Sequence, residues 1–253
     1  MLSQQQQQLF EDQGYLVLPA QAEPEFCQQV LNLAQASLNQ QVQPIEYEAD
    51  TAYPGAPSSR EAEGGMTARR LLQAYARDPM LAAWATGPKV KPAILSLLGA
   101  GAKLVQAHHN CIMTKQARYS SLTGWHRDSR YWHFQRPALI SCWLALRDEN
   151  VENGCLWVLP GSHKTGLSPE QLDTAQFLRE DLPENQHWLK QKLAVPLRQG
   201  DVLLFHSNLF HAAGKNLTND TKFSLVFTYR SDDNPAVPGS RSAARAEIEL
   251  TSD

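Results

Sequence analysis

Hydrophobic residues recur at helical spacing in the first part of the chain. Phe26, Val30 and Ala34 fall on one face of a helix, and Pro24 with its acidic neighbours is typical of a helix start. A run of glutamines near the start favours an earlier helix, because glutamine is a fair helix former. In total, helices are predicted at residues 4–12, 24–34, 66–76 and 79–98, with a short strand at 15–18.

In the later part of the chain, short apolar segments alternate with turn signals. Asn153-Gly154 is a strong hairpin signal, and a polar, partly helical insertion spans Ser168 to Gln191. Helices followed by many short strands indicate an α+β protein with a mainly β core, in which the strands form a barrel or a sandwich. Strands are predicted at residues 104–114, 138–146, 155–159, 193–197, 202–205 and 222–229.

The pattern contains no internal repeat and no second domain boundary. We therefore predict a single domain over residues 1–253, with a helical part at about 1–100, a barrel at about 101–230 and a tail at 231–253. Residues Pro44 to Gly65 have no hydrophobic period and exceed the length of a usual connector, which is typical of a lid or a binding loop. The tail is expected either to wrap the domain or to be loosely held.

Composition narrows the class of protein. The 253 residues are 42% hydrophobic and have a formal net charge of −3, which argues against nucleic acid or an anionic membrane as the main partner. No apolar run approaches the roughly 20 residues that span a bilayer, and the first residues lack the features of a secretory signal. The four cysteines, Cys27, Cys111, Cys142 and Cys155, form no CxxC pair. We expect reduced thiols in a cytoplasmic protein.

One short stretch contains candidate metal-binding chemistry. His126 and Asp128 are separated by one residue, and in an extended segment their side chains point to the same face. With a second histidine they would complete the two-histidine, one-carboxylate set that binds non-haem iron. His206 and His211 both follow a predicted strand, and spacing alone does not choose between them. A lone His-x-Asp pair often occurs by chance, so further motifs are needed.

Three motifs in order along the chain supply that context. They are Trp-His-Arg-Asp at 125–128, Asn-Gly-Cys-Leu-Trp-Val-Leu-Pro-Gly-Ser-His-Lys at 153–164, and the stretch 200–216 with Gly200-Asp201, His211 and Asn216. Together they resemble the phytanoyl-CoA dioxygenase family, over about residues 14–229. The resemblance implies a double-stranded β-helix, a cupin-like jelly-roll barrel, here with flanking N-terminal helices. It also implies an Fe(II)- and 2-oxoglutarate-dependent dioxygenase.

The resemblance further implies a role for each candidate ligand. It assigns the metal to His126, Asp128 and His211, and it leaves His206 as a structural residue. The cosubstrate 2-oxoglutarate would occupy two of the remaining metal positions and O₂ the third, with release of succinate and CO₂. The expected reaction is hydroxylation of a small organic substrate, which a carboxylate at position 128 favours over halogenation.

The distal carboxylate of 2-oxoglutarate requires a cation. In the resembled family an arginine supplies it eleven residues after the second histidine, and here that position is Lys222. On a strand Lys222 and Ser224 share a face, so an ammonium and a hydroxyl could hold one carboxylate together, although lysine lacks the planar fork of arginine. A solvated lysine at a strand end is the alternative, with Arg230 as the reserve candidate. Trp143 and Lys115 also match family positions near the cosubstrate.

Several alternatives stay open at this point. Lys115 shares a strand face with His109, while His108 lies on the opposite face, and the pattern does not say which face looks inward. Arg127 and Arg130 either contact the substrate or form a solvated rim. The same cofactor chemistry could produce desaturation, epimerisation or ring formation. Outside catalysis, the chain could be an inactive jelly-roll protein that binds a metal or a carboxylate. No pattern identifies the substrate or the oligomeric state.

Overall fold

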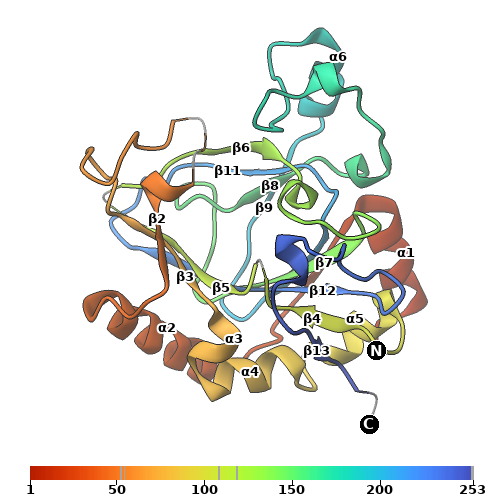
Figure 1. The fold of residues 1–253 in the computed structure, drawn as a ribbon, viewed down its shortest axis with the longest axis horizontal. Coiled ribbons are helices and arrows are strands. Elements are labelled where there is room, and N and C mark those ends of the chain that lie inside the picture. Colours follow the sequence, from red (N-terminus) through yellow and green to blue (C-terminus); the bar gives the residue numbers. More distant parts are fainter. Residues whose placement is uncertain (52, 54, 108, 118, 252–253) are drawn as a thin grey trace.

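Two antiparallel β-sheets face each other in the structure, a computed structural model that describes residues 1–51, 53, 55–107, 109–117 and 119–251 (Figure 1). The smaller sheet contains β6 (Thr123–His126), β8 (Leu156–Val158), β9 (Leu193–Val195) and β11 (His211–Ala213). The larger sheet contains β1 (Tyr15–Leu18), β2 (Ile45–Tyr47), β3 (Ala68–Leu72), β4 (Lys103–Val105), β5 (Cys111–Lys115), β7 (Leu139–Ala145), β10 (Val202–His206), β12 (Lys222–Arg230) and β13 (Ile248–Glu249).

The order of the strands is that of a jelly roll. The larger sheet follows the path β1-β10-β7-β12-β5-β3-β2, with β4 paired to β12 and β13 paired to β4. The smaller sheet has the order β6-β11-β8-β9. The predicted mainly β, jelly-roll architecture is therefore confirmed, although the two sheets are not joined into a closed barrel.

Helices cover the outer face of the larger sheet, as Figure 1 shows. They are α1 (Gln4–Gln13), α2 (Pro24–Asn39), α3 (Ala74–Arg77), α4 (Pro79–Thr86) and α5 (Lys91–Leu98). The sixth helix, α6 (Pro183–Leu189), belongs to the predicted polar insertion between β8 and β9. Short 3₁₀ helices complete the chain: η1 (Glu48–Asp50), η2 (Asp128–Tyr131), η3 (Ser162–Lys164), η4 (Pro169–Gln171) and η5 (Arg241–Ala243).

Strand β12 illustrates how the sequence directs side chains into the space between the sheets. All nine of its residues are buried because both of its faces are covered. Phe223 and Phe227 pack in the core beneath the helices, whereas Val226 packs in the core between the sheets. Because side chains alternate along a strand, Lys222 and Ser224 share the inner face with Val226. Two polar residues thereby enter the interior of the protein.

The predicted helix at residues 66–76 is wrong over most of its length. Residues Ala68–Leu72 form β3, which pairs with β2 and with β5, and only the short helix α3 follows. The residues of this stretch have adequate helix propensity, but the open edge of β5 provides ladder hydrogen bonds, and tertiary pairing overrides propensity. Arg70 lies opposite Met113 in this ladder. Because a helix was predicted here, Arg69 and Arg70 were not identified from the sequence as residues of the interior.

Two other predicted elements are each divided in two. The helix at 79–98 ends at Thr86 and restarts at Lys91, because Gly87-Pro88 lies between α4 and α5. The strand predicted at 104–114 forms β4 and β5, which pair with different parts of β12. The chain between them bulges out of the ladder. This bulge includes His109, while His108 lies outside the described residues.

The hairpin predicted at Asn153-Gly154 is wrong as a pairing. Gly154 does adopt a left-handed conformation, with φ +78°. The flanking strands, however, belong to different sheets: β7 pairs with β10 and β12, and β8 pairs with β11 and β9. The turn signal is local, whereas strand pairing depends on distant partners, so the turn here carries the chain from one sheet to the other.

The C-terminal tail wraps along the larger sheet. Strand β13 pairs with β4, and Glu247 forms an ion pair with Arg230. The backbone N–H of His133 donates a hydrogen bond of 2.8 Å to the hydroxyl of Ser242, which fixes η5 against the loop before β7. The tail is therefore an ordered part of the fold.

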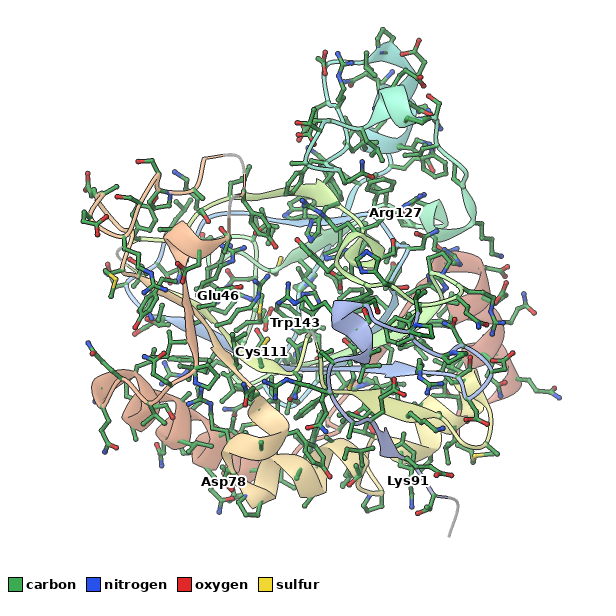
Figure 2. All side chains as sticks on the ribbon, in the orientation of Figure 1. Glu46, Asp78, Lys91, Cys111, Arg127 and Trp143 are labelled. Carbon is green, nitrogen blue, oxygen red and sulfur yellow. The ribbon has the colours of Figure 1, made fainter. Side chains whose placement is uncertain are left out.

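The state of the cysteines and the length of the helices agree with what the sequence predicts. All four cysteines are free and buried, and Figure 2 shows Cys111 near the centre of the molecule. Within the described ranges, no helix combines the length and the hydrophobicity that a membrane crossing requires.

Candidate metal centre and adjoining cavity

His126 and His211 lie directly opposite each other on neighbouring strands. They are register partners in the β6–β11 pair, and their ring centroids are 4.3 Å apart. Asp128 begins η2 two residues after His126. One ligand atom from each of the three side chains lies within 4.8 Å of the other two, and all three residues are buried. Of the two histidines left open by the sequence, His211 is the one that joins this cluster.

Backbone carbonyls fix the orientation of both imidazoles. His126 Nδ1 donates to Gly124 O at 2.8 Å, and His211 Nδ1 donates to Leu209 O at 3.0 Å. A proton on each Nδ1 leaves a lone pair on each Nε2. The two Nε2 atoms lie 3.8 Å and 3.5 Å from Asp128 Oδ1. Such an outer hydrogen bond to the second ring nitrogen is the usual companion of a metal-ligating histidine.

The two oxygens of Asp128 have different surroundings. Oδ2 lies 3.2 Å from His109 Nδ1 and accepts a hydrogen bond of 3.3 Å from the hydroxyl of Ser141. Oδ1 is buried and has no hydrogen-bond partner among the described residues. A buried carboxylate oxygen without a partner is costly. Because Oδ1 faces the two Nε2 lone pairs, a cation bound among the three atoms would remove this cost.

The protonation of the cluster is consistent with a cation site. Burial opposes the charge of Asp128, but His109 and His211 outweigh it and hold the pKa of the carboxyl well below its usual range. Burial and the neighbouring His211 lower the pKa of His126 well below its usual range. Burial also disfavours a charge on His211, but Asp128 overcomes it and raises the pKa of this imidazole. A metal ion would replace that proton.

His206 is located elsewhere in the structure. Its ring packs on His163, with centroids 5.2 Å apart, and its Nδ1 accepts a hydrogen bond from the backbone N–H of Asn208. Burial and the neighbouring His163 lower the pKa of His206 to about 4. It is a neutral residue of the protein framework.

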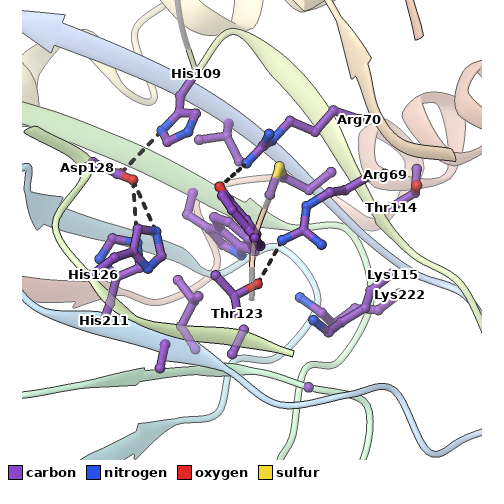
Figure 3. A pocket seen from close by; sticks show the side chains of 18 of the residues that line it. Arg69, Arg70, His109, Thr114, Lys115, Thr123, His126, Asp128, His211 and Lys222 are labelled. Atoms are coloured by element: carbon purple, nitrogen blue, oxygen red, sulfur yellow. Dashed lines mark hydrogen bonds and ion pairs between the residues drawn. The ribbon is translucent and has the colours of Figure 1, made fainter. Parts of the chain in front are cut away.

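A cavity extends from the three clustered side chains toward a group of buried basic side chains. Figure 3 shows His126, Asp128 and His211 at one end and the parallel side chains of Lys115 and Lys222 at the other. The two lysines are register partners in the β5–β12 pair, so they extend from adjacent strands. Further lining residues are Arg69, Thr123, Trp143, Leu156 and Phe205. The inward face of β5 is therefore the one that contains Lys115.

Lys222 and Ser224 do hold one carboxylate together, and it belongs to the protein. Glu149 accepts hydrogen bonds from Lys222 Nζ at 2.9 Å, from Ser224 Oγ at 2.6 Å and from Trp143 Nε1 at 3.0 Å. The ammonium also lies 4.9 Å from the centroid of the Trp143 ring. Glu149 is 1% exposed. It was missed by sequence reasoning because a glutamate in the polar stretch Arg147 to Asn150 looks like a surface residue.

Arg69 has a comparable internal partner. Its guanidinium donates to Glu48 Oε2 at 2.9 Å, to Ser121 Oγ at 2.9 Å and to Thr123 Oγ1 at 2.7 Å. Glu48 and Arg69 are buried, at 1% and 5% exposure. The predicted binding loop, residues 44–65, thus supplies a buried charge beside the cavity as well as the wall residue Tyr53.

Lys115 differs from these two cations. The one hydrogen bond that its ammonium makes among the described residues is to Ser121 O, at 3.3 Å. Burial, together with the charges of Arg69 and Lys222, lowers the pKa of Lys115 well below its usual range. Gly154 provides the space for its side chain, since a Cβ there would lie 2.7 Å from Lys115 Cε. Three cations against two carboxylates, Glu48 and Glu149, leave one positive charge without a carboxylate partner when Lys115 is protonated.

The other arginines considered from the sequence lie outside this cavity. Arg230 pairs with Glu247 and donates to the carbonyls of Ser231 and Asp232, so the reserve candidate is already occupied. Arg127 donates to backbone carbonyls of the Pro-Gly-Ser-His turn region and packs over the ring of Phe210. Arg130 packs over the rings of Tyr131 and Phe177. These side chains stabilise loops around the centre.

Removal of the Glu149 carboxylate should be strongly destabilising. We expect Glu149→Gln to lower the free energy of unfolding by about 3 kcal/mol, because loss of one partner leaves a buried charge uncompensated. The double variant Glu149→Leu/Lys222→Met should be less destabilised than Glu149→Gln, since both charges are gone. Chemical denaturation followed by circular dichroism measures both, with the exposed Glu152→Gln as the matched control. An equal loss in the single and double variants would contradict the charge argument.

Comparisons with known proteins agree with the fold. The epimerase SnoN from nogalamycin biosynthesis, solved with Fe³⁺, alpha ketoglutarate and nogalamycin RO, has a TM-score of 0.74 at 21% identity, over 98% of this chain and 95% of that one. EctD from S. alaskensis, solved with 2-oxoglutarate and 5-hydroxyectoine, has a TM-score of 0.76 at 21% identity, over 93% of this chain and 78% of that one.

Sequence comparison identifies the family. Phytanoyl-CoA dioxygenase 1 of Oryza sativa subsp. japonica is 28% identical over 148 residues, which is 58% of this chain and 52% of that protein. The chain thus spans about half the length of this relative, and a rat relative is matched over a similar share. Residues 10–224 match the phytanoyl-CoA dioxygenase (PhyH) family as a whole. Because this match covers most of the chain and includes all three clustered side chains, the protein belongs to the phytanoyl-CoA dioxygenase family.

Proposed function

We propose that this protein is a non-haem Fe(II)- and 2-oxoglutarate-dependent dioxygenase that hydroxylates a small organic substrate and releases succinate and CO₂. The observation on which this rests is a single cavity with two complementary ends. One end contains two imidazole Nε2 atoms and a carboxylate oxygen without a hydrogen-bond partner among the described residues. The other end contains buried basic side chains that exceed the neighbouring carboxylates by one positive charge when Lys115 is protonated. A metal ion and an organic dianion are the ligands whose charges complement these two ends.

At the metal end, His126, Asp128 and His211 would hold Fe(II). Two neutral imidazoles and one carboxylate on one side of the ion form the donor set that non-haem iron oxygenases use, and they leave the opposite side open. When bound, the iron together with 2-oxoglutarate and O₂ supplies the oxidising chemistry. The role of the protein is to hold the ligand atoms in place: Gly124 O and Leu209 O orient the imidazoles, and His109 with Ser141 orients the carboxylate.

At the cationic end, Lys115 and Lys222 would bind the distal carboxylate of 2-oxoglutarate, with Trp143 as a wall. Glu149 and Ser224 restrain the Lys222 ammonium, so Lys115 contributes the charge that lacks an internal carboxylate. The overall charge supports a dianionic cosubstrate. Fe(II) with Asp128 has a net charge of about +1, and the cationic end adds about +1 when Lys115 is protonated.

The metal assignment predicts a clear difference between the two late histidines. Asp128→Asn and His211→Asn should each weaken Fe(II) binding by more than about 100-fold, because loss of a ligand costs more than loss of an outer hydrogen-bond partner. His206→Asn should bind Fe(II) like the unaltered protein. Anaerobic isothermal titration calorimetry measures the three affinities. Strong binding by Asp128→Asn would refute the ligand set.

The cosubstrate assignment is tested by anaerobic addition of Fe(II) and then 2-oxoglutarate. A visible metal-to-ligand charge-transfer band should appear. Lys115→Met and Lys222→Met should each require at least about tenfold more 2-oxoglutarate for half of the band, since each removes a charged hydrogen-bond donor. The exposed Lys190→Met serves as the control and should not change the titration. Formation of succinate under air then tests turnover.

The affinity for 2-oxoglutarate should depend on the protonation of Lys115. Burial lowers the pKa of this lysine in the free protein, and a bound carboxylate would raise it again. The complex therefore holds more protons than the free protein above the free-state pKa. Affinity should be constant below that pKa and fall as the pH rises through it, up to the pKa of the complex. Band titrations across pH measure the effect, and Lys115→Met should lose this component.

One observation favours a second candidate function. Lys222 and Ser224 already bind Glu149, as they would in a jelly-roll protein that binds a metal or a carboxylate without oxidising a substrate. Iron binding without a charge-transfer band, and without succinate formation, would support this alternative. Within catalysis, the likeness to the epimerase SnoN keeps epimerisation as an alternative outcome, and product analysis distinguishes it from hydroxylation.

A further inference from the structure

A second cavity adjoins the one that extends from His126, Asp128 and His211 to the lysines. Its volume of about 530 Å³ is within the size range of small-molecule sites. It opens between the loop after β2, the bulge between β4 and β5, and the C-terminal tail. Tyr53, Arg70 and His109 line both cavities, so the two spaces meet at these side chains. The remaining wall residues that matter here are Tyr131, Gln106, Arg241 and Arg245.

The junction between the cavities lies beside the candidate metal centre. The ring of His109 packs edge-on against Tyr131, with centroids 5.6 Å apart, while its Nδ1 faces Asp128. The hydroxyls of Tyr53 and Tyr131 contact each other, and Arg70 donates to Tyr53 at 3.2 Å. A molecule in the second cavity would thus have its inner end at polar, aromatic side chains next to the metal.

The charges of the second cavity do not cancel. Arg70 is paired with Glu46, and Asp50 is paired with Arg60. Arg241 and Arg245 have neither a hydrogen bond from the side chain nor an ion pair in the part of the chain that the structure describes. Both arginines are exposed and line the cavity. The cavity therefore has two positive charges without partners, and both carboxylates in its wall are already neutralised.

The tail that contains these arginines is fixed to the fold. Ser242, in the same 3₁₀ helix as Arg241, accepts a hydrogen bond from the backbone of His133. Gln106 Nε2 donates to Ala246 O at 2.7 Å, directly after Arg245. Figure 1 shows this helix, in dark blue, in front of the strands of the larger sheet. The positions of the two arginines are consequently set by tertiary contacts.

We infer that the second cavity binds the organic substrate and that this substrate is a small organic anion. Its carboxylate or phosphate group is held by Arg241 and Arg245 at the outer end, and its uncharged part extends past Tyr53 and Tyr131 toward the metal. Arginine forks match the oxygens of both anion types. This inference rests on the proposed function for the identity of the inner end, whereas recognition of the anion depends on the tail alone.

The test uses the whole chain of residues 1–253 with saturating 2-oxoglutarate, so that the inner cationic site is occupied. The probes share one skeleton: phenylacetate and phenyl phosphate as anions, and phenylacetamide as the neutral analogue. Isothermal titration calorimetry measures their binding to the unaltered protein, to Arg241→Gln/Arg245→Gln, and to the control Arg147→Gln/Arg198→Gln. The control removes the same charge from exposed arginines that line neither cavity.

At least one anionic probe should bind about tenfold more tightly than phenylacetamide, as expected for a charged hydrogen-bonded contact. The preference should disappear in the tail variant and persist in the control variant. The absence of a preference, or its persistence in the tail variant, would overturn the inference. Which anion binds better distinguishes carboxylates from phosphate esters as the substrate class.

The Fe(II)–2-oxoglutarate band is recorded on the same samples, and it distinguishes failure of the anion site from failure of the proposed oxygenase function. Retention of the band in the tail variant, with loss of anion preference, supports a substrate site distinct from the cosubstrate site. If no protein forms the band but the anion preference is present and depends on the tail, then the proposed oxygenase function fails while the anion site stands.

Discussion

The surrounding structure depends on the need to compensate the buried charge of Asp128. An anion in the interior must be compensated, and here His109 and Ser141 satisfy one oxygen while the other faces two imidazole lone pairs. That arrangement requires His126 and His211 to lie opposite each other, which the β6–β11 register provides. It also requires the bulge between β4 and β5, which brings His109 to the carboxylate. The two sheets and the bulge are therefore arranged around one charge.

The same requirement organises the other end of the cavity. Lys222 and Arg69 each have a buried carboxylate, and these come from Glu149 and Glu48, which lie far from their partners in sequence. Among the described residues Lys115 has no carboxylate partner, so it is the cation most available to a ligand. This end of the cavity is thus nearly neutral apart from Lys115, which favours a specific anion over general attraction of negative charge.

The sequence predicted well what depends on local pattern and on the motifs. The His126-x-Asp128 spacing and the alternation of β12, which turns Lys222 and Ser224 inward, both follow from the period of an extended chain. Glu149 could not be predicted, because its burial results from partners contributed by β7 and β12. Arg69 was missed for a related reason: helix propensity is a local property, whereas β3 exists because β5 offers an edge to pair with. Buried charges depend on long-range partners, and a single sequence does not display these.

The turn at Asn153-Gly154 looks suitable for an insertion but is part of the cavity wall. A short polar turn between two strands is the usual choice for inserting an affinity tag or joining a second protein. Here Gly154 lies against the side chain of Lys115 and against Gly214 O, so the turn forms part of the wall at the cationic end. An insertion at this point would leave the strands free to pair while crowding Lys115. A fusion protein built there would fold normally but lose ligand binding at the cationic end.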